Sequence, residues 1–204
     1  MRWIWALALS VFGVLAQASE TDPKAAVAPL VVARDAFYED VALYQNGSLS
    51  EDQLVERIAN QFAPLLDDRK IALRVMGRFA RQATPEERSA FTERLQTSLV
   101  DAYARGLTVY GGEQLVLPET GVILQPARAL VEASLEAPGK EPLPIQFALG
   151  YQQAAGWRVE NVVVAGINLG LTLRNQFAEL VKTTGSVQGA INAWDYDSAS
   201  QGVN

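Results

Sequence analysis

The stretch GWRVENVVVAGINLGLTLRNQF, residues Gly156–Phe177, decides how the rest of the chain is arranged. Its first half alternates with a period of two, which is typical of a strand with at least one buried face. Because residues 162–165 are apolar on both sides, we expect a central strand covered on both faces, or one that lines an apolar hollow. Two sets of side chains are predicted to face opposite sides: Trp157, Val159 and Val163 on one, and Arg158, Glu160, Val162 and Val164 on the other.

Beyond Gly166 the apolar period changes from that of a strand to that of a helix. This one segment therefore predicts a strand, a tight exit and an amphipathic helix. The residues at helical spacing are Leu169, Leu173, Phe177, Leu180 and Val181.

Helical spacing also dominates the chain before residue 110. We expect residues 19–28 to form a mobile leader and a first helix to cover 29–44, starting at Pro29. A second helix follows the Asn46-Gly47 turn, and Pro64 is expected to kink or end it. Asp67 or Asp68 can cap a third helix, whose apolar face would be Ala72, Val75, Met76 and Phe79.

A row of arginines, Arg74, Arg78 and Arg81, runs down the other side of this third helix. One interpretation is a solvated face that pairs with nearby carboxylates. The other is a contact for lipid phosphates or an acidic partner, since guanidinium groups suit phosphate. The sequence Thr84-Pro85-Glu86-Glu87 then predicts a capping box and the start of a fourth helix.

After Gly111-Gly112 the helical spacing gives way to short runs in which apolar and polar residues alternate, broken by Gly and Pro. These runs predict strands at 114–117, 122–124, 129–137 and 144–152, ahead of the one that starts at Gly156. Their short connections favour antiparallel pairing. With a short last helix over 187–194, the chain is expected to form a single α+β domain.

The first 18 residues resemble a secretory signal peptide: Arg2, an apolar run, then Ala16-Gln17-Ala18 as a cleavage site. The expected organisation is a signal peptide over 1–18, a domain over 19–194 and a flexible tail over 195–204. The chain has 17 basic and 23 acidic residues, a net charge of −6. This balance argues against non-specific binding of nucleic acid.

The chain contains neither His nor Cys. Ser-His-Asp and Cys-His catalytic arrangements are therefore excluded, and the common zinc sites are disfavoured. The carboxylate pairs Asp67/Asp68 and Glu86/Glu87 stand at expected helix starts, where capping explains them. An enzyme that uses two distant carboxylates stays open.

Two separated motifs resemble the MlaC/toluene-tolerance family of periplasmic phospholipid-binding proteins. One is Gly-Trp-Arg-Val, then Val-x-Gly-Ile-Asn-Leu and Leu-Arg-Asn-Gln-Phe, in the stretch quoted above; the other is the run from Met76 to Arg88. The likeness covers about residues 71–181. It departs at Ala80, where the family commonly has a second aromatic residue, and at Thr172-Leu173, which replace the usual Asn-Tyr.

The resemblance implies a fold and a function. The fold would be a curved antiparallel sheet of about four to five strands, wrapped by helices around an acyl-chain cavity. The protein would carry phospholipid across the periplasm between an outer-membrane lipoprotein–porin complex and an inner-membrane ABC transporter with a substrate-binding ring. No cofactor is implied, and the carrier would not be an enzyme.

The resemblance also makes the apolar stripes candidate lipid contacts, although stripes of this kind far more often form a solid core. Arg78 and Arg174 are candidates for contact with a head group or a partner. The candidate lining residues are Met76, Phe79, Leu95, Leu99, Tyr103, Leu107, Phe147, Leu149, Val163, Leu169, Leu173 and Phe177.

Two alternatives to a carrier remain at this point. One is a carboxylate-based enzyme that acts on a small apolar substrate, and the other is a periplasmic adaptor with a solid core. A continuous apolar cavity would disfavour the adaptor, and perturbed carboxylates inside such a cavity would favour the enzyme.

Overall fold

The structure, a computed structural model, describes residues 20–107 and 111–195, and for residues 101 and 103–107 the backbone alone. The expected signal peptide lies outside the described residues, as does the expected tail beyond residue 195. The helices are α2 (Pro23–Gln45), α3 (Glu51–Phe62), α4 (Asp68–Met76), α5 (Pro85–Leu107), α6 (Leu169–Thr184) and α7 (Val187–Ala193), with 3₁₀ turns η1 (Ala63–Leu65) and η2 (Gly77–Arg81).

The strands form one antiparallel sheet in the order β1-β3-β4-β5-β6, with β2 also paired to β3. The expected α+β fold and antiparallel pairing are therefore confirmed. The described residues contain six strands rather than four to five. The strands are β1 (Gln114–Val116), β2 (Val122–Gln125), β3 (Arg128–Glu136), β4 (Leu143–Gln152), β5 (Gly156–Val164) and β6 (Ile167–Asn168).

The unexpected strand, β6, is only two residues long and follows a two-residue turn. Both turn residues, Ala165 and Gly166, have positive φ, at 49° and 82°. Two-residue hairpin turns of this kind match the natural twist of the paired strands. The turn brings Ile167 and Asn168 back against Val164 and Val163, and α6 begins directly afterwards.

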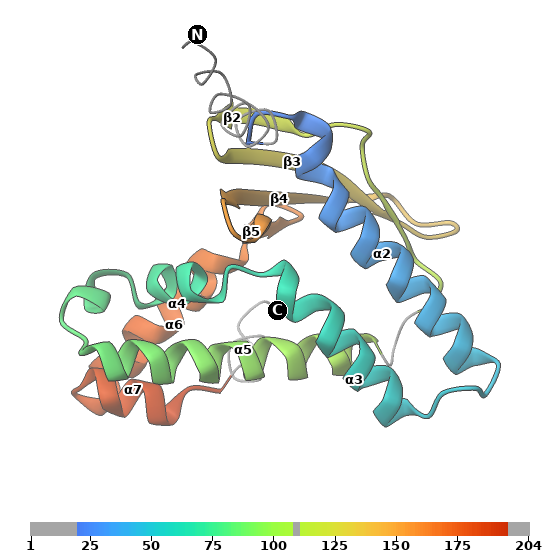
Figure 1. Cartoon of the computed structure of the whole chain (residues 1–204). Helices are drawn as coiled ribbons and strands as arrows, with labels where there is room; N and C mark the ends of the chain where they lie inside the picture. Colours follow the sequence, from blue (N-terminus) through green and yellow to red (C-terminus); the bar gives the residue numbers. More distant parts are fainter. Residues whose placement is uncertain (1–19, 108–110, 196–204) are drawn as a thin grey trace, which may run out of the picture.

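The helices cover one face and one end of the sheet (Figure 1). Helix α2 packs on a face, while α4 and α6 contact β5 at the end of the strand stack, where Leu66 bridges to Val159, with α5 and α7 beyond them. No helix of the described residues is long and apolar enough to span a membrane.

The interior between α2 and the sheet, here called the α2 core, is a continuous cluster of buried apolar side chains. Ala26 and Val27 on α2 are fully or almost fully buried in it. The cluster consists of Ala26, Val27, Leu30, Ala33, Leu65, Ala129, Val131, Leu149, Trp157 and Val159.

A second cluster, the helical core, lies among α4, α5, α6 and α7. Three aromatic rings hold its centre: the centroid of Phe91 is 4.6 Å from that of Phe177 and 5.1 Å from that of Trp194. All three residues are almost completely buried. The predicted short last helix is confirmed as α7, and the buried Trp194 side chain fixes its end in the helical core.

The predicted mobile leader over 19–28 is wrong. Helix α2 begins at Pro23, because Asp22 caps it by accepting a hydrogen bond from the Lys24 N–H, and proline suits the first helical position. Pro29 lies inside the helix. The early start places Ala26 and Val27 in the α2 core.

Strand β5 is not central along its length, because it pairs with β4 throughout but with β6 at Val163 and Val164 alone. The alternative expectation, a strand that lines an apolar hollow, is confirmed by Val159 and Val162. The predicted facing of its second half is also wrong. Val159 pairs with Leu149 and Asn161 with Ala148, so Glu160 is one extra residue, a β-bulge, and the alternation shifts after it. Val162 consequently packs with Val159 against the α2 core.

The predicted third helix is shorter than expected. Gly77 adopts φ 56° and ψ −123°, a conformation reserved for glycine, and ends α4 before Phe79. Three local predictions are confirmed: α3 ends before Pro64, Asp67 caps α4, and Thr84 and Glu87 form a capping box at α5.

Candidate functional site

A pocket of about 720 Å³ lies between β5 and the helices α4 and α6. It follows β5 from Leu66, which forms an isolated bridge with Val159, to β6. The volume falls in the usual range for small-molecule sites, roughly 300–1,000 Å³. Its apolar lining consists of Leu66, Ile71, Val75, Leu99, Val159, Val162, Leu169, Leu171 and Leu173.

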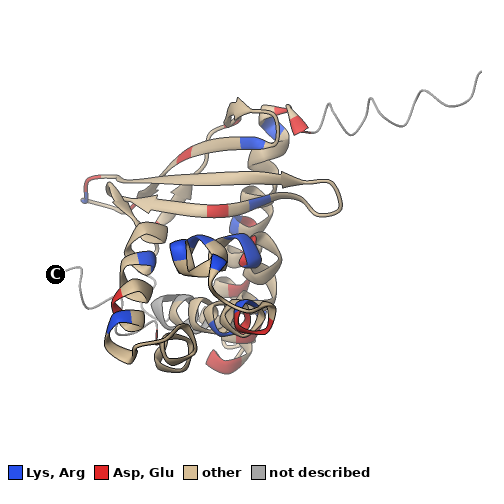
Figure 2. Cartoon of the chain, turned by 90° about the vertical axis from the view of Figure 1, so that its left-hand side faces the viewer, with Lys and Arg blue, Asp and Glu red and all other residues tan. Residues whose placement is uncertain are grey.

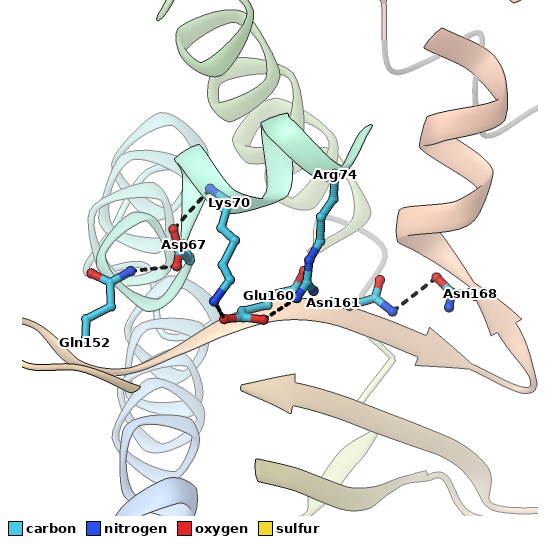
Figure 3. Close-up of polar contacts among 7 residues, drawn as sticks. All are labelled: Asp67, Lys70, Arg74, Gln152, Glu160, Asn161 and Asn168. Carbon is cyan, nitrogen blue, oxygen red and sulfur yellow. Dashed lines mark hydrogen bonds and ion pairs between the residues drawn. The ribbon is translucent and has the colours of Figure 1, made fainter. Parts of the chain in front are cut away.

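The bulge in β5 turns Glu160 toward α4, where two cations meet it (Figure 3). Its carboxylate pairs with Lys70, and it accepts a hydrogen bond from an Arg74 Nη at 2.6 Å. The Glu160 side chain is 3% exposed, whereas each cation is 40% exposed. Room for the carboxylate comes from Gly150 on β4, where a Cβ would overlap it. These contacts hold α4 against β5.

A pair of asparagines attaches the start of α6 to the same strand (Figure 3). Asn161 Nδ2 donates to Asn168 Oδ1 at 3.1 Å, and its own Oδ1 accepts from the Gly170 N–H at 3.0 Å. Asn168 also caps α6 by accepting from the Leu171 N–H. The asparagine that breaks the apolar row of β5 therefore positions a wall of the pocket.

Three exposed arginines line the open side of the pocket: Arg78 and Arg81 from η2, and Arg174 from α6. The Arg78 guanidinium carbon lies 4.9 Å from the centroid of the Phe79 ring. Arg174 lies against Gly77, where a Cβ would be 2.7 Å from its Nε. Figure 2 shows Lys and Arg positions gathered on the helices just below the sheet, on the side where α4 and α6 lie.

The structure brings together part of the residue set predicted from the sequence. Leu99, Leu169 and Leu173 line the pocket, as do both predicted arginines. Met76 and Phe79 border a second hollow of about 220 Å³, which Arg78 and Arg174 also line. These two arginines therefore stand between the two hollows.

The other predicted residues lie elsewhere. Leu95 and Phe177 are buried in the helical core, and Leu149 in the α2 core with Phe147 packed against it. Val163 is half-buried and pairs with Gln146 and Asn168. Tyr103 and Leu107 are among the residues for which the structure describes the backbone alone.

Several pocket residues were missed by sequence reasoning. Val159 and Val162 line the pocket, whereas Val163 was the one residue of this strand among the predicted lining residues. Arg74 and Arg81 stood in the predicted arginine row. Arg74 follows the first interpretation of that row by pairing with a carboxylate, while Arg81 lines the open side.

The lining offers little to acid–base chemistry. Glu160 is the one carboxylate among the lining side chains that the structure describes, and two cations already engage it. Burial, with the Asp67 carboxylate as a smaller cause, raises the pKa of Asp68, although Arg158 opposes the shift; Asp68 lies outside the lining. Within residues 20–107 and 111–195, no cluster of three acidic residues is placed to hold a metal ion.

A family model and a curated relative match this chain. The family model described as MlaC protein matches residues 41–195. The toluene tolerance protein ttg2D of Pseudomonas putida is 30% identical over 140 residues, 64% of this chain and 61% of that protein. The match thus spans less than two thirds of this relative's length.

A solved structure has the same fold. It is that of the phospholipid-binding protein from Ralstonia solanacearum in complex with a phospholipid, at 1.53 Å resolution. The TM-score is 0.69 with 21% sequence identity, over 82% of this chain and 93% of that one. Since the family model matches well over half of the chain, the chain belongs to the MlaC family.

Proposed function

We propose that this chain is a periplasmic phospholipid carrier that holds acyl chains in the pocket beside β5. The observation that carries the proposal is an apolar pocket of about 720 Å³ in a chain of this family. Its fold is shared with a protein described as a phospholipid-binding protein in complex with a phospholipid. A carrier needs such a hollow, and a solid-core adaptor does not.

The energetics suit reversible loading. Each buried methylene is worth about 0.8 kcal/mol against water, so two acyl chains do not cross an aqueous space uncovered. A bilayer interior is as apolar as the pocket, and transfer between them is therefore nearly balanced. Small differences at a docked partner then decide whether lipid enters or leaves.

We propose specific positions for the lipid on this basis. Leu99, Leu169 and Leu173 would contact acyl chains, and Arg78 and Arg174 would meet the head group at the open side. The smaller hollow beside Met76 and Phe79 lies next to these arginines and would take a further segment of lipid. The other residues predicted from the sequence remain predictions.

The cellular setting belongs to the same proposal. Residues 1–18 would direct export and be removed, leaving the mature protein in the periplasm. The partners would be an outer-membrane lipoprotein–porin complex and an inner-membrane ABC transporter with a substrate-binding ring. Membership of the MlaC family supports this setting.

The carrier would release its lipid chemically unchanged. An acid–base enzyme needs a proton donor or acceptor that is free to react, and the lining carboxylate, Glu160, is engaged by Lys70 and Arg74. Lipid recovered after prolonged incubation is expected to have its original mass. Hydrolysed or modified lipid would favour the enzyme.

Native mass spectrometry of the mature protein, purified from a periplasm without detergent, tests the proposal. We expect phospholipid at a fixed stoichiometry. Leu99→Trp should reduce loading, because the indole occupies the pocket, while Leu124→Trp is the matched control on the exposed side chain of β2, which is 61% exposed. A lipid-free mass together with no uptake from liposomes would contradict the proposal.

A further inference from the structure

Charge at the pocket has the opposite sign to that of the chain. The whole chain has a net charge of −6. Among the side chains that the structure describes, four arginines line the pocket, Lys70 adjoins it, and Glu160 is the one lining carboxylate. The pocket and its border therefore carry a net charge of about +4, within a protein that repels anions elsewhere.

The positive charge is unbalanced where the pocket opens. Glu160 is engaged by Lys70 and Arg74, so it balances neither Arg78, Arg81 nor Arg174. In the part of the chain that the structure describes, these three arginines form no ion pair. An anion that binds at this side of the pocket is attracted by each of the three guanidinium groups.

Local contacts position two of the three arginines before any ligand arrives. Arg78 lies over the Phe79 ring, and Arg174 occupies the space that a side chain at position 77 would fill. Guanidinium groups bind phosphate oxygens through paired N–H donors. Arginines at the edge of an apolar pocket therefore suit a ligand with an anionic group joined to apolar chains.

We propose that Arg78, Arg81 and Arg174 make the pocket select anionic phospholipids over zwitterionic ones. This inference rests on the proposed carrier function. The phosphate of either lipid class would meet the arginines. The ammonium group of a zwitterionic lipid would then lie near guanidinium groups of the same charge, without a free carboxylate to pair with it. A head group such as glycerol adds no positive charge and avoids this repulsion.

Competition within one vesicle tests the preference without an effect of vesicle charge. The protein is incubated with vesicles of equimolar phosphatidylglycerol and phosphatidylethanolamine that have identical acyl chains, then separated, and its lipid is extracted and quantified. Exposed ion pairs are each worth about two- to fivefold in affinity, so we expect about a tenfold enrichment of phosphatidylglycerol. At about 1 M salt, where the Debye length is about 3 Å, the enrichment should fall.

Charge-matched variants assign the preference to these residues. Arg78→Gln/Arg81→Gln/Arg174→Gln should lower the enrichment to about twofold or less, and because the enrichment is a ratio of the two extracted lipids, a fall in total loading does not enter it. Lys24→Gln/Arg128→Gln/Lys140→Gln removes the same charge from exposed positions away from the pocket and should keep the preference. A preference retained by the first variant would overturn the assignment.

The remaining outcomes separate the two proposals. Equal loading of both lipids by the unmodified protein overturns the selectivity and leaves the carrier standing. No loading of either lipid overturns the carrier itself. Calorimetry with inorganic phosphate on lipid-free protein forms a third arm. Phosphate binding that the triple arginine variant loses, without any lipid preference, would assign the arginines to free phosphate and overturn the inference.

Discussion

Strand β5 borders two interiors that differ in how they are filled. Toward α2, Trp157 and Val159 belong to a continuous cluster of buried apolar side chains. Toward α4 and α6, Glu160 and Asn161 make polar contacts around a pocket of about 720 Å³. The comparison shows that one strand can support a solid core and a hollow if polar contacts hold the second side open.

The largest expected difference comes from one substitution made in each interior. Leu149→Ala removes a side chain that is 2% exposed in the α2 core, and it should lower the free energy of unfolding by about 2–5 kcal/mol. Leu99→Ala, beside the pocket, should cost less than about 2 kcal/mol because part of its surface already faces a hollow.

Urea unfolding of both variants, with unchanged m-values, measures the difference. Equal losses would mean that the pocket closes in the lipid-free protein. The contrast between the two interiors would then be wrong.

The ion pairs between α4 and β5 give the next largest effect. Glu160→Gln leaves Lys70 and Arg74 without their partner, and we expect a loss of about 2–3 kcal/mol. The loss stays below that of a fully buried pair because both cations are 40% exposed and regain water. Glu179→Gln, which removes the exposed partner of Lys182, is the control and should cost less than about 0.5 kcal/mol.

Replacing Gly77 tests how the open side of the pocket is built. Gly77→Ala forces a side chain into a conformation reserved for glycine and against Arg174, and it should cost about 1–2 kcal/mol in thermal or chemical unfolding. Gly47→Ala has a similar positive φ but meets open space. A smaller loss for Gly47→Ala would show that Gly77 carries more than the cost of a positive φ, from its ψ of −123° and the Arg174 contact together. Identical losses would contradict this.

The smallest expected effect is a pH dependence at the start of α4. Because the pKa of Asp68 is raised in the folded protein, mainly by burial, the folded state holds this proton more tightly than the unfolded state. Ionisation therefore costs stability as the pH rises from the ordinary pKa of 3.8 through the raised value, and the cost is absent below 3.8.

Asp68→Asn removes this titration. The unfolding free energy of the variant relative to the unmodified protein should rise with pH between 3.8 and neutrality, by less than about 1 kcal/mol since the group is only half-buried and screened by solvent. Unfolding at pH 3 and pH 7 measures it. A relative stability that is flat or falls with pH would contradict the assigned direction.

Local signals in the sequence predicted much of this fold. Caps at Asp67 and Thr84, the stop at Pro64 and the alternation of β3 and β4 each depend on neighbouring residues alone, and each was read correctly. The start of α2 was misjudged because small residues such as Ala26 look like a leader, although they permit close packing on the sheet.

The pocket was harder to predict because it depends on contacts between distant residues. The bulge at Glu160 exists only in the pairing of β5 with β4, and its ion pairs span 86 and 90 positions of sequence. Alternation alone therefore assigned Val162 and Val163 to the wrong sides. The arginine row was visible, but nothing local separates Arg74, which is paired, from Arg81, which lines the open side.

The contacts of Glu160 have a consequence for an empty carrier. One carboxylate binds Lys70 and Arg74, one helical turn apart, and so fixes both the height and the rotation of α4 over β5. The distance between α4 and β5 is thus set by ion pairs within the protein, which form without lipid. The pocket can therefore keep its width when its contents leave, so that unloading requires the wetting of its walls but no collapse and re-forming of the fold.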